Sequence, residues 1–218
     1  MSALGCYGKL ACRGDFVTRG LAPDFIRPWD GWLSAVMQAS QQQLGEGWLG
    51  AYLVSPLWRF ALAAGVCGPN AVLGVLMPSV DRVGRYFPLT VAQILEPGQN
   101  VASAAGGGEG WFGVVEDLML STLDQGAELD AFEAALSRLP PVSVAARAPV
   151  RRTEGLQIFS SSDFQARQLE LTAIACEGAS LWWGNAAQGA AQGFVRCRGL
   201  PDSQRFGSVL LGKGAGAQ

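Results

Sequence analysis

The chain contains 218 residues, of which 49% are apolar, 16% are charged and 9% are aromatic. So large an apolar fraction excludes a disordered polypeptide, because it supplies enough surface for a substantial buried core. The formal net charge of −2 gives no long-range attraction for phosphate groups, so we expect no nucleic-acid ligand.

An amphipathic helix is predicted over residues 23–44. Apolar side chains recur there at helical spacing, opposite a polar face that includes Asp24, Arg27 and Gln38. The apolar positions are Phe25, Trp29, Trp32, Leu33, Val36, Met37 and Leu44. Core packing is the commoner role for such an aromatic stripe, so we place these tryptophans in the interior rather than in a groove for a partner.

Three short apolar runs, each bounded by proline or glycine, follow this helix. Continuous apolar character over so few residues predicts strands that are buried on both faces, which places them in the middle of a sheet. The three runs are residues 57–63, 72–77 and 89–95.

The second half of the sequence predicts both helices and strands. Helical spacing occurs at residues 111–123 and 129–139, and Pro140 ends the second helix because proline cannot continue the hydrogen-bond ladder. A further helix with strands before and after it is expected beyond them. These elements are the strand 156–159, the helix 163–176, and the strands 180–183 and 194–197, which pair with each other.

Strands mixed with helices in both halves predict an α/β fold. The expected architecture is a three-layer sandwich, in which a mixed sheet is covered by helices on both faces. The sequence has no internal repeat, and residues 145–153 are the only stretch with the composition of a linker. We therefore expect residues 1–218 to form a single domain.

The sequence predicts a cytoplasmic protein without direct membrane insertion. Its longest apolar runs fall far short of the roughly 18–20 residues that span a bilayer. Lys9, Arg13 and Asp15 interrupt the N-terminus before an apolar stretch of signal-peptide length accumulates. The five cysteines form an odd set without a Cys-x-x-Cys pair, which suits reduced thiols in a cytosol.

Histidine is absent from the sequence, and its absence excludes several enzyme mechanisms. Ser-His-Asp and Cys-His hydrolytic arrangements, histidine phosphotransfer and histidine-ligated metal sites all require that side chain. The composition does not exclude catalysis by carboxylates, lysine, tyrosine, an activated cysteine or an oxygen-ligated metal. The sequence contains, however, no acidic run such as Asp-x-Asp that would bind a metal. We therefore expect a protein that is not an enzyme.

Two blocks within the first 95 residues carry distinctive sequence. The first reads GKLACRGDFVTR over residues 8–19 and is followed by Phe25, Trp29 and Trp32. The second reads SPLWRF over residues 55–60 and continues as GVLMPSVDRVGRYFPL over residues 74–89. Together these blocks resemble the TagF/ImpM family of type VI secretion system-associated proteins, although Ala11 stands where that family commonly has proline. The remainder of the chain matches the family more loosely.

This resemblance implies a cytoplasmic, post-translational regulator of bacterial type VI secretion. Such a protein binds the forkhead-associated scaffold protein of the system and restrains assembly of the injection apparatus. The implied activity is therefore repression through a protein–protein interaction. The resemblance implies no cofactor, no catalytic residue and no metal ligand.

Two other classes of function stay open at this point. One is a small-molecule enzyme that uses Asp15, Asp81, Arg82 and Arg85 in a polar pocket, and the geometry of the pocket distinguishes it from a binding protein. The other is a structural subunit of the secretion apparatus, which would stay attached to the apparatus during firing.

Two polar turns supply most of the candidate contacts for a partner. The candidates are Arg13 and Asp15 in the first turn, and Asp81, Arg82, Arg85 and Tyr86 in the second. The second turn is expected to be a loop between two buried strands, where exposed charges and an aromatic ring can meet a partner. The alternatives are a purely structural turn around Gly14, and internal salt bridges in which Asp15 neutralises Arg82 or Arg85.

The predicted strands also indicate the roles of three further residues. Arg59 lies inside a predicted strand, where a charged side chain requires a carboxylate or carbonyl partner, so we expect a structural ion pair. Trp182 and Trp183 point to opposite faces of a strand, so only one of them is available to a partner. We take Trp182 as that candidate contact.

Overall fold

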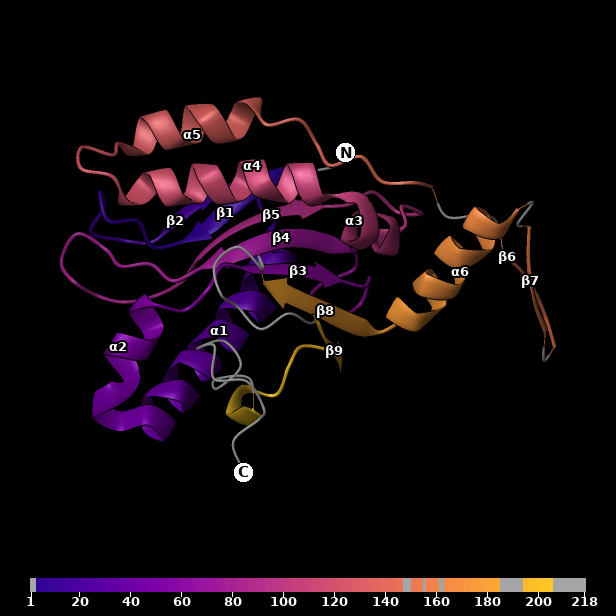
Figure 1. Cartoon of the computed structure of the whole chain (residues 1–218), viewed down its shortest axis with the longest axis horizontal. Coiled ribbons are helices and arrows are strands. Elements are labelled where there is room, and N and C mark those ends of the chain that lie inside the picture. Colours follow the sequence, from indigo (N-terminus) through magenta and orange to yellow (C-terminus); the bar gives the residue numbers. More distant parts are fainter. Residues whose placement is uncertain (1–2, 147–149, 155, 161–162, 185–193, 206–218) are drawn as a thin grey trace.

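The protein is described by a computed structural model over residues 3–146, 150–154, 156–160, 163–184 and 194–205. Its centre is a seven-stranded sheet in the order β2-β1-β5-β4-β3-β8-β9 (Figure 1). In that order the strands are β2 (Val17–Arg19), β1 (Ala3–Gly8), β5 (Leu89–Ile94), β4 (Val72–Met77), β3 (Trp58–Leu62), β8 (Ala179–Gly184) and β9 (Phe194–Arg198). All of these described pairings are antiparallel.

Helices cover both faces of this sheet, as Figure 1 shows. On one face lie α4 (Glu109–Leu120) and α5 (Leu129–Arg138), and on the other lie α1 (Pro23–Leu44) and α2 (Trp48–Leu53). The predicted α/β three-layer sandwich is therefore confirmed. The expectation of a mixed sheet is wrong for the described strands, because no helix joins two neighbouring strands and so no parallel crossover unit forms.

Several further elements complete the described fold. They are α3 (Val101–Gly107), α6 (Phe164–Cys176), the 3-10 helices η1 (Gly45–Gly47) and η2 (Ser121–Leu123), and a separate antiparallel pair of strands, β6 (Val150–Thr153) and β7 (Leu156–Phe159). Because β6 falls within residues 145–153, the expectation of a linker there is wrong from residue 150 onward; residues 147–149 lie outside the described ranges. None of the described helices is both long and apolar enough to cross a membrane.

The predicted helix 23–44 is confirmed as α1 with the same bounds. Pro23 lies in its first turn, where a missing N–H costs no intrahelical hydrogen bond, and Gly45 ends the helix with a φ of 51°. Between these ends the apolar face of the helix packs into the interior, where Phe25 and Leu33 are nearly inaccessible to solvent. Helical periodicity was therefore sufficient to place this element.

An aromatic core fills the space between α1 and the sheet. Trp29 is fully buried, and its ring centroid lies 4.7 Å from that of Phe60 and 6.0 Å from that of Trp182. Both buried indole N–H groups have acceptors, since Trp29 donates to Thr90 Oγ1 at 2.9 Å and Trp182 donates to Ser180 Oγ at 3.0 Å. The interior placement predicted for the tryptophans of the first helix is confirmed for Trp29.

The opposite face of the sheet encloses a buried charge under α4. Arg59 of β3 donates to both carboxylate oxygens of buried Glu116, from Nε to Oε1 at 2.6 Å and from Nη2 to Oε2 at 3.0 Å. Its third nitrogen donates to Glu109, and its Cζ atom lies 5.4 Å from the centre of the Phe112 ring. The structural ion pair predicted for Arg59 is therefore confirmed.

Candidate functional site

The two polar turns singled out in the sequence meet at one end of the sheet, at the left of Figure 1. They are the connection 9–16 between β1 and β2 and the connection 78–88 between β4 and β5. The main-chain N–H of Arg82 donates to the carbonyl of Arg13 at 2.9 Å, and the Ser79 hydroxyl donates to the carbonyl of Lys9 at 2.7 Å. These two connections therefore form one hydrogen-bonded unit, termed the paired loops below.

Asp81 holds the paired loops together. Its carboxylate is fully buried and accepts hydrogen bonds from Lys9 Nζ at 2.9 Å and from Arg85 Nε at 2.7 Å. The main-chain N–H groups of Val83 and Arg85 donate to the other oxygen at 3.0 and 2.9 Å. Internal salt bridging is thus confirmed for Arg85, with Asp81 rather than Asp15 as the carboxylate. Asp81 is inaccessible to a partner, so its prediction as a contact residue is wrong.

These contacts determine the pKa of Asp81. Burial by itself raises the pKa of a carboxyl group, but donation by Lys9 and by the main chain and side chain of Arg85 outweighs it, with help from the Val83 N–H. The pKa of Asp81 is therefore held well below its ordinary value. Such a group stabilises the fold above the pKa of the unfolded chain, and the stabilisation is lost as pH falls towards the folded-state value.

The Asp81→Asn variant is expected to melt at a lower temperature than wild type at about pH 7, because Lys9 then loses its buried counter-charge. The difference in melting temperature should begin to narrow below about pH 4, because the carboxyl of the unfolded wild-type chain then takes up a proton while Asp81 of the folded protein stays ionised. Thermal unfolding, followed by circular dichroism over this pH range, measures the difference in melting temperature. Asp15→Asn, at an exposed carboxylate, is the matched control. A difference that stays constant down to about pH 3 would contradict an ionised, paired Asp81.

A tight turn presents Arg82 and Val83 to solvent. The N–H of Gly84 donates to the carbonyl of Asp81 at 3.0 Å, and Gly84 has a φ of 86°, a left-handed conformation that favours glycine. The Arg85 guanidinium folds back and also donates to the carbonyl of Gly14. Arg82 and Val83 therefore form the tip of the second loop, and Val83 is 64% exposed.

Aromatic packing fixes the first of the paired loops. Phe16 stacks on Tyr7 with ring centroids 5.7 Å apart and meets Phe87 edge-on at 4.9 Å. The ammonium group of Lys9 lies 5.1 Å from the centre of the same ring. Phe16 nevertheless keeps part of its ring in solvent, so it combines a fixed position with an accessible apolar surface.

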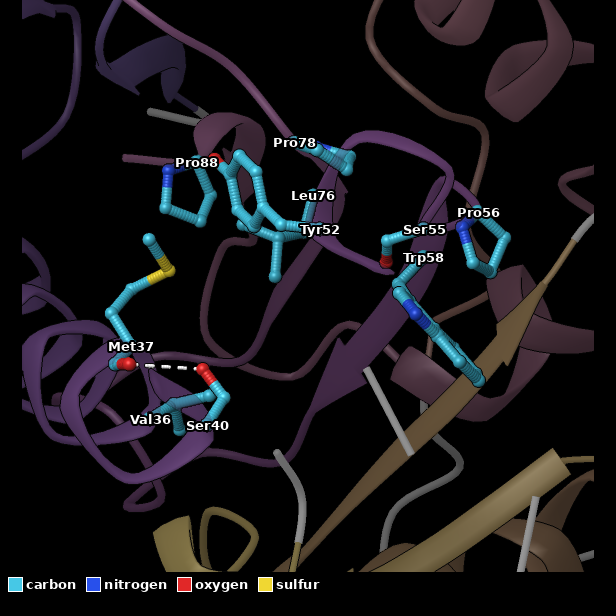
Figure 2. Close-up of a pocket in the computed structure, with 10 residues that line it drawn as sticks. All are labelled: Val36, Met37, Ser40, Tyr52, Ser55, Pro56, Trp58, Leu76, Pro78 and Pro88. Carbon is cyan, nitrogen blue, oxygen red and sulfur yellow. Dashed lines mark hydrogen bonds between the residues drawn. The ribbon is translucent and has the colours of Figure 1, made fainter. Parts of the chain in front are cut away.

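Tyr86 joins the second loop to α2. It is half-buried and packs edge-on against Trp48 and Tyr52, with centroids 5.9 and 5.7 Å away. The Tyr52 hydroxyl donates to the carbonyl of Ser79 and accepts from its N–H, both at 2.8 Å. In Figure 2 the Tyr52 ring lies beside Pro88, with Pro78 also lining the same small cavity. Tyr86 is therefore mainly a support of the loop, with part of its ring left accessible.

The predicted contacts Arg13, Asp15, Arg82 and Arg85 are all exposed. Asp15 accepts the main-chain N–H of Phe16 at 2.8 Å. Within the described residues, the guanidinium groups of Arg13 and Arg82 have no hydrogen-bond or ion-pair partner. Phe16 and Val83 lie next to these charged residues in the sequence and were not predicted as contacts. The sequence could have indicated them only as single apolar residues within polar turns.

Trp182 is misassigned as a candidate contact. It is 0% exposed and lies in the aromatic core, with its ring centroid 5.2 Å from that of Trp32 on α1. Trp183 points to the other face, where it packs edge-on against Phe112 at 5.2 Å and remains partly exposed. The two residues do face opposite sides, but the accessible one is Trp183.

Two cavities among the described residues bear on the polar pocket expected of a small-molecule enzyme, and neither is built from the predicted residues. The cavity drawn in Figure 2, between α1, α2 and the sheet, has a volume of about 20 Å³, which is room for about one water molecule and not for a substrate. A wider groove of about 600 Å³ lies between α3, α6 and the β8–β9 pair. Asp15, Asp81, Arg82 and Arg85 line neither. The described residues contain no group of three or more acidic or cysteine side chains placed to hold a metal ion.

Comparison with known proteins gives matches to a family model and to solved structures. A family model described as the TagF N-terminal domain, type VI secretion system-associated, matches residues 5–139. The crystal structure of PA0076 from Pseudomonas aeruginosa PAO1 is similar at 48% sequence identity with a TM-score of 0.91, over 99% of this chain and 97% of that one. No curated protein sequence matches the chain.

Proposed function

The chain belongs to the family of TagF N-terminal domains of type VI secretion system-associated proteins, and we propose that it is a cytoplasmic repressor of that system. It acts after translation by binding the forkhead-associated scaffold protein, and thereby restrains assembly of the injection apparatus. In this role residues 1–218 act as one functional domain that catalyses no reaction and needs no cofactor.

The observation that carries the proposal is the exposed, rigid tip of the paired loops. Arg82 and Val83 project from a turn that is fixed by the buried carboxylate of Asp81 and by the packing of Tyr86 on α2. A surface that is already ordered loses little conformational entropy on binding, and arginine is enriched among the residues that dominate interfaces. These properties suit a protein that works by contact with another folded protein.

The bonding of Asp81 favours this role over catalysis. A general acid or base must exchange a proton with a substrate, and an oxygen ligand must offer a lone pair to a metal. The Asp81 carboxylate already receives hydrogen bonds from two cationic side chains and two main-chain N–H groups. It therefore serves as a support for the neighbouring contact residues.

Deletion of the gene from a strain that carries the secretion cluster is expected to raise secretion of the system's substrates, and a wild-type copy should restore the low level. Full-length tagged protein should capture the unphosphorylated scaffold from the same cells. A fall in secretion on deletion would instead support a structural subunit of the apparatus. Turnover of a small molecule that co-purifies with the protein and disappears in Asp15→Asn would support the enzyme alternative.

A further inference from the structure

A second feature lies at the same end of the molecule as the paired loops. It is a groove of about 220 Å³ between the end of α2 and η2, termed the end groove. Its lining residues are Leu53, Val54, Ser55, Pro56, Leu57, Met77, Pro78, Leu120 and Leu123. This volume is below the roughly 300–1,000 Å³ of pockets that hold drug-sized ligands. The end groove therefore suits one or two apolar side chains of a protein better than a free small molecule.

Apolar side chains at the rim of the end groove are open to solvent. Val54 is 78% exposed, and Leu53 and Leu123 are more than half exposed. Isolated exposed apolar residues need no explanation, but the neighbours Leu53 and Val54 meet Leu123, which is distant in the sequence, at one depression. Such a gathering is typical of a surface that another protein covers.

The end groove adjoins the start of the second of the paired loops. Met77 and Pro78 line the groove, and the chain runs directly from them into the second loop. Tyr52, next to Leu53, is tied by two hydrogen bonds to Ser79 of that loop. Figure 1 shows α2, the β4–β5 connection and the turn between α4 and α5 at the same end of the sandwich. A partner seated on the Arg82 tip is therefore placed to reach the groove.

The charges along this surface are not balanced. Lys9 and Arg85 share the single carboxylate of Asp81, whereas the guanidinium groups of Arg13 and Arg82, whose main chains are hydrogen-bonded to each other, have no partner among the described residues. Unpaired guanidinium groups favour carboxylates, because each can bind a carboxylate with two parallel hydrogen bonds. On the far side of the groove Asp124 follows Leu123, so a carboxylate is disfavoured there.

We infer that the end groove and the adjacent Arg13–Arg82 pair bind one acidic, amphipathic segment of the partner protein. An apolar side chain of the segment fills the groove between Val54 and Leu123, and Asp or Glu side chains beside it pair with Arg13 and Arg82. The inference rests on the proposed function, and it adds the chemistry of the partner and the direction in which its segment lies. No phosphate is required, because carboxylates supply the anion.

The test is isothermal titration of full-length protein with purified, unphosphorylated scaffold. Arg82→Glu and Val54→Asp should each weaken binding by about tenfold or more without lowering the melting temperature, since both side chains are exposed. Arg27→Glu on α1 and Leu171→Asp on α6 are matched controls with exposed side chains away from this end, and they should bind as wild type does. Raising NaCl from about 0.05 M to about 0.3 M should weaken wild type more than Arg82→Glu.

The outcomes separate this inference from the proposed function. If wild type does not bind the scaffold in any form, the proposed function fails first. If wild type binds and either test variant binds equally well at a normal melting temperature, the segment does not use both features and the inference is overturned while the proposed function stands. Binding that appears only with phosphorylated scaffold would identify phosphate as the anion and would also overturn the inference.

Discussion

The Glu116→Ala variant is expected to lose about 3–5 kcal/mol of unfolding free energy, because it leaves the Arg59 charge buried without its main partner. Both residues are almost inaccessible to solvent, so water cannot replace the lost carboxylate. A loss of this size is a large part of the roughly 5–15 kcal/mol by which domains are stable. Urea denaturation measures it directly from the midpoint and slope of the transition.

Two further variants distinguish this explanation from a simple loss of hydrogen bonds. Glu109 also binds Arg59, but its side chain is 71% exposed, so Glu109→Ala should cost only about 0–1 kcal/mol. The double variant Arg59→Met/Glu116→Leu should recover most of the stability lost in Glu116→Ala, because it removes the unpaired charge as well. Equal losses for Glu109→Ala and Glu116→Ala would show that burial does not control the strength of the pair.

The Trp182→Ala variant is expected to lose about 3–5 kcal/mol, the range for truncation of a large buried aromatic side chain. Its ring is parallel to that of Trp29 and lies 5.3 Å from that of Phe60, so truncation leaves a cavity that these neighbours cannot fill without moving. Trp183→Ala should cost less, because part of that ring is already in solvent. Urea denaturation of both variants gives the comparison.

This pair of variants also tests which tryptophan a partner can reach. If Trp182→Ala kept wild-type stability and lost scaffold binding, the burial of Trp182 would be contradicted. A loss of stability with retained binding at low temperature is the expected result. Trp183→Ala is the matched control, since it lies at the next position of the same strand and faces the other layer of helices.

Elements with a strong periodic pattern could be predicted from the sequence. The bounds of α1 and β4 agree with the prediction, those of β3 differ by one residue at each end, and those of β5 differ by one residue at the C-terminal end. Each of these elements buries a full stripe or both faces, so its apolar pattern is continuous.

The elements that were missed have little periodic signal. β1 and β2 are short, and β1 is rich in small residues because the chains approach closely: a Cβ atom on Gly5 would lie 2.0 Å from the carbonyl oxygen of Arg19. α3 is built largely from alanine and glycine, so it carries no apolar stripe. These segments are fixed by tertiary contacts, which a local pattern does not contain.

The candidate site was only partly predictable for a related reason. The family-like sequence blocks pointed to the paired loops. Which charged side chains are buried depends, however, on how the two loops pack against each other. In the folded protein Asp81 is buried and Arg82 is exposed. Likewise, the alternation of Trp182 and Trp183 fixes only that they face opposite sides. The end groove combines Leu53, Met77 and Leu123 from three distant segments, so it appears only once the chain is folded.

Calorimetric titration of the purified full-length protein with its unphosphorylated forkhead-associated scaffold tests the proposed function most directly. We expect saturable binding, because the paired loops offer an ordered surface with unpaired arginines and need no phosphate on the partner. An absence of binding, whether or not the scaffold or this chain is phosphorylated, would contradict it.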